Sequence, residues 1–219
     1  MDAFFDSLTT ALYAHRDPGK AAGMKAYMRH QFAFLGMQKS ERLQISDPFI
    51  KIKWREEHID WSFVQRLWDL PEREFQYTAL HYLGKMQKYL HKTDIPRLKS
   101  FICAKSWWDT VDSIAPLVGS VNLRFPESKK EYLWDWIRDP DFWVRRVSIL
   151  FQLKYKSETD TEFLSTAILN NCTNKEFFLN KAIGWALREY SKNNPEWVRI
   201  FIKKHTLHPL SVREGSKYI

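Results

Sequence analysis

Apolar residues recur at steps of three and four along most of the chain, which is the pattern of amphipathic helices. Clear examples are FVQRLWDL before Pro71, FQYTALHYLGKM after it, and KEFFLNKAIGWALREY near the C-terminus. Pro71, Pro96, Pro140 and Pro195 each precede a periodic segment, and proline is well tolerated where a helix begins. The pattern predicts a succession of helices, each about ten to fifteen residues long.

The helical stripes themselves repeat along the chain. Phe75, Trp108, Trp143 and Phe178 follow one another at 33, 35 and 35 residues, and each opens a stripe that continues four and seven residues further on. This period is that of helix-pair repeats of the HEAT or TPR size. No Asn-Gly or Asp-Gly turn joins alternating apolar runs, which argues against a β-sandwich or barrel. We therefore expect one all-α domain over residues 1–219, an α-solenoid whose concave face suits a long partner.

Asp112 interrupts this apolar pattern. The residue four after the opening aromatic is Ala79, Val147 or Ala182 in the other three repeats. A carboxylate is costly to bury unpaired, so this one must be paired, solvated in a cleft or used in chemistry. Asp112 lies one helical turn after Trp108, so the two side chains share a face. A purely structural role, capping or bridging neighbouring helices, remains the alternative.

Stacking of the repeats would bring Asp112 and Trp108 close to Arg146 and Trp185, whereas Trp143 is expected in the core. A carboxylate, two indoles and an arginine are together suited to the hydrolysis of an N-glycosidic bond. A carboxylate stabilises the oxocarbenium-like sugar or activates a water, and indole faces attract positive charge. An arginine would hold a phosphate through paired hydrogen bonds.

Composition narrows the partner. Lys and Arg number 34 against 26 Asp and Glu, which gives a formal charge of +8 and favours a polyanion. Short basic clusters at 51–55, 129–130 and 203–204 are interpreted as solvated helix faces and are left out of the site.

Other sequence signals concern metals, membranes and location. Cys103 and Cys172 are too few for a disulfide framework, and the seven histidines are scattered, so we expect no metal and no cofactor. No apolar run approaches the roughly 18 residues of a membrane span. Asp2 and Asp6 stand where a signal peptide carries positive charge. We therefore expect that the protein has no membrane partner and that it is cytoplasmic.

At KSWWDTVDSIAP the sequence resembles the AlkD-type DNA alkylation-repair glycosylases. The likeness covers nearly the whole chain, and further matching stretches are 27–42, 67–76, 149–156 and 175–190. The resemblance implies a right-handed α-solenoid of HEAT-like repeats that wraps duplex DNA. It also implies hydrolysis of the glycosidic bond of cationic alkylpurines, 3-methyladenine and 7-methylguanine, in base-excision repair. Such an enzyme is monofunctional, leaving an abasic site without a lyase step, and we expect it to be a monomer.

The resemblance also implies roles for individual residues. By position, Asp112 is similar to the family's catalytic carboxylate, and Trp108 and Trp185 are similar to its two indoles that contact the deoxyribose. The expected DNA-binding residues are Arg146, Tyr27, Gln38 and Lys154.

Two other functions remain open. Repeat proteins commonly bind protein partners on such surfaces, so a protein-interaction scaffold is one alternative. The other is a non-catalytic binder of unusual or damaged DNA, because some relatives of the family bind DNA without excising bases and depart at the catalytic positions. The presence of Trp108, Asp112 and Trp185 favours the enzyme.

Overall fold

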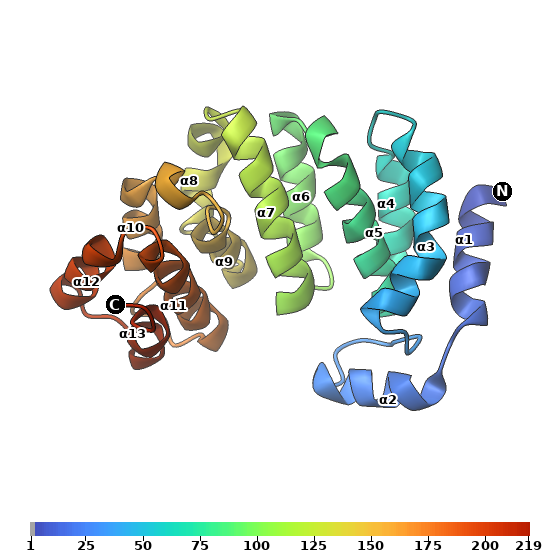
Figure 1. The fold of residues 1–219 in the computed structure, drawn as a ribbon, viewed down its shortest axis with the longest axis horizontal. Coiled ribbons are helices and arrows are strands. Elements are labelled where there is room, and N and C mark those ends of the chain that lie inside the picture. The colour runs from blue at the N-terminus through green and yellow to red at the C-terminus, as the bar shows by residue number, and fades with distance from the viewer. Residues whose placement is uncertain (1–2) are drawn as a thin grey trace. The chain divides into compact units, whose positions relative to one another are not determined.

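The computed structural model describes residues 3–219 and is helical throughout that range, apart from turns and loops (Figure 1). Its closest approach to β-structure is an isolated bridge between Ala33 and Glu72. The all-α fold class that the periodicity predicts is confirmed. Two compact units, Met1–Leu90 and His91–Ile219, each have their own core. The expectation of one domain over 1–219 stays a prediction.

The first unit consists of five α-helices and a closing 3₁₀ turn. Their bounds are α1 Ala3–Ala14, α2 Pro18–Tyr27, α3 Lys39–Trp54, α4 Trp61–Asp69, α5 Arg73–Met86 and η1 Gln87–Tyr89.

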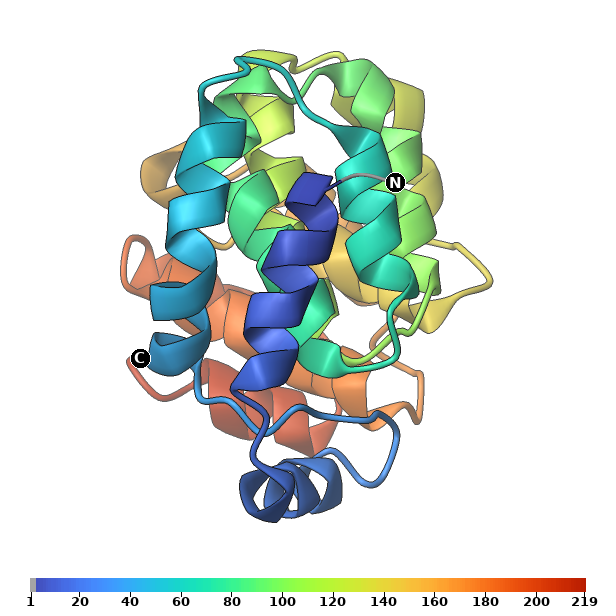
Figure 2. The ribbon, with the colours of Figure 1, turned by 90° about the vertical axis from the view of Figure 1, so that its right-hand side faces the viewer.

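Helix α5 is the centre of the first unit, since most of its side chains are buried against α3 and α4. Helix α1 covers α3 and α4 from outside (Figure 2). Phe4 meets Phe49 of α3 with ring centroids 5.7 Å apart, and Phe5 meets Phe63 of α4 edge to face at 6.2 Å. Helix α2 lies across the ends of these helices rather than alongside them (Figure 1) and buries none of its residues.

The second unit contains eight α-helices and three short turns of other helix types. Their bounds are η2 Lys92–Asp94, α6 Ile95–Cys103, α7 Trp108–Arg124, η3 Lys129–Leu133, α8 Trp134–Trp136, α9 Phe142–Leu150, η4 Lys156–Glu158, α10 Thr161–Leu169, α11 Phe177–Ser191, α12 Pro195–Lys204 and α13 Pro209–Gly215.

Successive inner helices of the second unit pack on one another: α7 lies against α6 and α9, and α11 lies against α9, α12 and α13. The repeat phasing is confirmed in outline, because Phe75, Trp108, Trp143 and Phe178 each lie within the first turn of a helix. Trp143 is 6% exposed, as expected of a core residue. Its ring contacts Trp107 and Phe178, with centroid distances of 5.9 and 4.8 Å.

Aspartates set the starts of several helices. The carboxylates of Asp60, Asp141 and Asp160 accept hydrogen bonds of 2.9, 2.8 and 3.0 Å from backbone N–H groups in the first turns of α4, α9 and α10. Each bond satisfies a donor that a helix leaves unpaired at its N-terminus. Among residues 3–219, no helix is both long enough and apolar enough to cross a membrane.

Candidate active site

Asp112 projects from the second turn of α7 on a face where its neighbours Val111, Ile114 and Ala115 are buried. Its own side chain keeps 17% of its surface exposed. The carboxylate is therefore at the edge of the core, with access to solvent on one side.

Arg146, from α9, holds this carboxylate in a fixed plane. Its Nε donates to Asp112 Oδ1 at 2.7 Å and its Nη2 donates to Asp112 Oδ2 at 2.8 Å, a bidentate pair. Its Nη1 donates to the backbone carbonyl of Phe178 at the start of α11. Only 4% of the arginine side chain is exposed. One guanidinium thus links α7, α9 and α11 and fixes the orientation of Asp112.

An open cleft of about 390 Å³ surrounds the exposed side of Asp112. Trp108 of α7 and Trp185 of α11 both line it, together with Arg146. The structure therefore brings together the four residues that the sequence placed in one group. Phe177, Phe178, Lys181 and Arg188 complete the lining.

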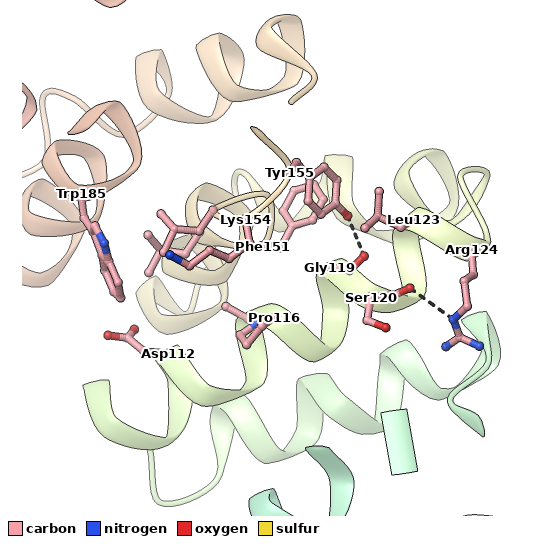
Figure 3. Close-up of a pocket in the computed structure, with 13 residues that line it drawn as sticks. Asp112, Pro116, Gly119, Ser120, Leu123, Arg124, Phe151, Lys154, Tyr155 and Trp185 are labelled. Carbon is pink, nitrogen blue, oxygen red and sulfur yellow. Dashed lines mark hydrogen bonds between the residues drawn. The ribbon is translucent and has the colours of Figure 1, made fainter. Parts of the chain in front are cut away.

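A second, more apolar cleft of about 430 Å³ begins at the same carboxylate. Asp112 and Trp185 lie together at one end of it, and Leu123, Arg124 and Tyr155 lie at the other (Figure 3). Asp112 and Trp185 are therefore a wall shared by both clefts.

Lys154 lines the apolar cleft, with 73% of its side chain exposed. Its Nζ is 2.9 Å from Oε1 of Glu189, which also pairs with Lys192 at 2.7 Å. Burial alone would raise the pKa of the Glu189 carboxyl, but hydrogen bonds from the two lysines hold it below its usual value. Lys154 is thus an exposed cation of the cleft lining, and its ion pair with Glu189 restrains its position.

Tyr27 and Gln38 meet in the first unit, where both line a cleft of about 440 Å³. Tyr27 ends α2 with 74% of its surface exposed, and Gln38 is the N-cap of α3. Lys20 and Tyr77 line the same cleft. Each unit therefore presents an aromatic cleft with at least one cation in its lining.

Buried Glu74 explains how the segment before Gln38 is held. Its carboxylate accepts three backbone hydrogen bonds, from Leu35 at 2.9 Å, Gly36 at 2.9 Å and Met37 at 3.2 Å. Arg42 lies nearby, and its burial lowers the pKa of its guanidinium to about 10. Sequence periodicity gave no sign of these buried charges, because they lie on helices that otherwise look amphipathic.

The sequence prediction also missed Lys181 and Arg188. Both line the cleft of Asp112, and they lie four residues before and three residues after Trp185 on α11. That spacing places all three on one helical face, so it was a usable signal. The described residues contain no group of three or more His, Cys, Asp or Glu side chains able to hold a metal ion.

The fold and site together define a helical-repeat protein with a paired carboxylate in a cationic, indole-lined cleft. The chain belongs to the DNA alkylation repair enzyme family, whose model matches residues 8–219. It is similar to a solved structure described as a predicted DNA alkylation repair enzyme from Enterococcus faecalis. The two are 34% identical, with a TM-score of 0.87 over 94% of this chain and 97% of that chain. No curated protein matches this chain.

The resemblance to DNA alkylation-repair proteins is therefore confirmed at the level of the family. Membership gives the chain a role in DNA alkylation repair and indicates DNA as its partner.

Proposed function

We propose that the protein is a monofunctional DNA glycosylase that hydrolyses the N-glycosidic bond of cationic alkylpurines in duplex DNA. The substrates are 3-methyladenine and 7-methylguanine, and the product is an abasic site. The observation that carries this proposal is the Asp112 carboxylate, fixed by Arg146 and exposed to a cleft that Trp108 and Trp185 also line.

The chemistry suits a cationic lesion. As the bond between C1′ and the purine nitrogen breaks, its electron pair goes to the base, which leaves neutral, and positive charge develops on the sugar. A fixed carboxylate facing C1′ stabilises that charge or orients the attacking water, whose oxygen bonds to C1′ and whose proton is released. The indole faces of Trp108 and Trp185 attract the same developing charge.

Arg146 has a defined part in this mechanism. Its two hydrogen bonds leave each oxygen of Asp112 with a further lone pair, and the carboxylate keeps an exposed side toward the cleft. A preorganised carboxylate need not reorient as charge develops, which is the main source of electrostatic catalysis. We propose Lys154, Tyr27 and Gln38 as DNA contacts, since each lines an open cleft.

The deciding experiment is a base-release assay on methylated duplex DNA. We expect release of 7-methylguanine by the wild-type protein and its loss, by about 100-fold or more, in Asp112→Asn, with DNA affinity little changed. Asp109→Asn is the matched control, because it removes the same charge from the first turn of α7 and does not line the cleft.

Each other outcome points elsewhere. Equal release by wild type and Asp112→Asn would remove this carboxylate from the mechanism. Duplex binding without release by the wild type would favour a non-catalytic DNA binder. Absence of duplex binding at low salt would favour a protein-interaction scaffold.

A further inference from the structure

Glu214, on the last helix, is a buried carboxylate among cations. Its side chain is 6% exposed. Oε1 is 3.1 Å from Lys181 Nζ, while Oε2 is 2.7 Å from Arg188 Nη1 and 2.9 Å from Lys217 Nζ. Arg213 Nε approaches Oε1 at 4.0 Å. One negative charge thus meets four positive ones, so the cluster keeps a net positive charge.

Close packing of α11 and α13 is what puts Glu214 in this place. A Cβ added at Gly184 would lie 2.6 Å from the Cβ of Glu214, so only glycine lets the two helices approach so closely. Ser211, one turn earlier on α13, donates a 2.8 Å hydrogen bond to the carbonyl of Asn180 and fixes the register. The Cβ of Glu214 is therefore held against the backbone of α11 at Gly184.

The two α11 cations bound by Glu214 also line the cleft of Asp112. Lys181 and Arg188 are seven residues apart, which separates their Cα atoms by about 10.5 Å along the helix. Binding to two oxygens of the same carboxylate makes their charged ends converge at Glu214, and Trp185 lines the same cleft as both cations. Their side chains remain 40% and 24% exposed, so both can still reach a ligand in the cleft.

If the ion pairs of Glu214 served only to hold α11 against α13, Lys181 and Arg188 would not need to line the cleft. Lys217, two residues after the end of α13, already pairs with Glu214, and it does not line the cleft. Two convergent, partly exposed cations in an indole-lined cleft fit a phosphodiester, which offers several acceptor oxygens and a negative charge. Asp112, lining the same cleft, would then face the adjoining sugar.

We propose that Glu214 is a positioning residue that holds Lys181 and Arg188 together as a clamp for one phosphodiester group next to the sugar at Asp112. This inference rests on the proposed function, since it assigns the backbone contact of the same site.

Substitution of Glu214 by Gln tests the proposal, because the direction of the change in DNA affinity distinguishes a positioning role from an effect of net charge. Glu214→Gln raises the net charge by one, so electrostatic attraction alone would tighten binding to DNA. Loss of orientation acts in the opposite direction. Glu196→Gln is the matched control, because it adds the same charge on α12 at an exposed pair with Arg199 and does not line the cleft.

The measurement is the dissociation constant of the full chain for a duplex with a tetrahydrofuran abasic-site analogue, followed by fluorescence anisotropy. We expect Glu214→Gln to weaken binding about 3–10-fold and Glu196→Gln to leave it unchanged or tighter. We also measure release of 7-methylguanine under single-turnover conditions. For Glu214→Gln relative to wild type, we expect the protein concentration that gives half-maximal rate to rise by a larger factor than the maximal rate falls. Equal or tighter binding by Glu214→Gln overturns the proposal.

A second pair of variants keeps the test decisive if Glu214→Gln does not fold by circular dichroism. Lys181→Gln with Arg188→Gln removes two positive charges from the clamp, and Lys203→Gln with Lys204→Gln removes two from the end of α12. The clamp variant must bind the duplex more weakly than the α12 variant, and equal affinities overturn the proposal.

Failure of this inference is distinct from failure of the proposed function. If the wild type releases 7-methylguanine and Asp112→Asn does not, while the clamp variants bind normally, only the role of Glu214 is wrong.

Discussion

Arg146 lies beside Asp112, as the repeat stacking predicts, and its hydrogen bonds are made within the protein. The resemblance assigned it to the DNA backbone, whereas the structure gives its N–H groups to Asp112 and to the carbonyl of Phe178. With 4% of the side chain exposed, its first effect is on the orientation of the carboxylate. Its contact with DNA stays a prediction.

Arg146→Lys separates these two roles while keeping the charge. A lysine ammonium cannot reproduce the planar bidentate pair, so we expect the single-turnover rate at saturating protein to fall about 10-fold or more. The half-saturating concentration should change little. Arg145→Lys, at the neighbouring position that bonds Asn171 instead, is the control. Weaker binding with an unchanged rate would support the direct phosphate contact.

Residues that the pattern could identify were those that broke it. Asp112 was identifiable because a carboxylate replaced an apolar residue at a repeated position. Glu74 and Glu214 also lie in the core, but each has partners that are distant in sequence: Leu35 is 39 residues from Glu74, and Arg188 is 26 residues from Glu214. Their partners become visible only once the helices are packed.

At the scale of helices, the approach of α7 to the end of α9 depends on Gly119. A Cβ at this position would lie 2.3 Å from the backbone carbonyl oxygen of Phe151, which cannot move away as a flexible side chain can. Tyr155 confirms the close contact, because its hydroxyl donates a 2.7 Å hydrogen bond to the carbonyl of Gly119.

We expect Gly119→Ala to lower the free energy of unfolding by about 1–3 kcal/mol, because the backbone of one helix must shift. Urea unfolding followed by circular dichroism measures this change. Gly84→Ala within α5 is the control, since nothing lies within 4 Å of its added Cβ, and it should stabilise by about 0.5–1 kcal/mol. Destabilisation of equal size in both variants would contradict the packing argument.

The contact between α11 and α13 predicts a pH dependence. Hydrogen bonds from Lys217 and Lys181 lower the pKa of Glu214 from 4.5 to about 2. Because the folded value lies below the unfolded one, the stabilisation is fully present above pH 4.5 and is lost as pH falls toward 2. Wild type should exceed Glu214→Gln by about 2 kcal/mol in free energy of unfolding at neutral pH. Urea titrations should show this difference shrinking below pH 4.5, and a difference independent of pH would contradict the assignment.

For the whole molecule, the formal charge of +8 predicts salt-sensitive binding. Each phosphate that the protein neutralises releases a counterion, so we expect duplex affinity to fall about tenfold or more between 50 and 200 mM salt. Anisotropy titrations on undamaged and abasic duplexes measure the slope. Duplex affinity that does not change with salt concentration would show that the positive charge does not contribute to DNA binding.

Sequence periodicity was sufficient for the all-α class and for the phase of the repeats, because helix packing depends on residues at regular spacing. Residues such as Trp143 and Trp108 were correctly divided between core and cleft. The pattern could not show that Trp107, next to Trp108, contributes its ring to the aromatic cluster with Phe178 instead. Nor could it show two compact units, since no change of composition marks residue 90.

The three-way bonding of Arg146 has a consequence for folding. Asp112, Arg146 and the carbonyl of Phe178 come from α7, α9 and α11, so the guanidinium has its full set of partners only after all three helices have docked. A local opening that detaches α11 would release one bond of Arg146 and remove Trp185 from both clefts, while the core between α6, α7 and α9 stays closed. The residues that line the Asp112 cleft are thus in place together only when α7, α9 and α11 are all docked.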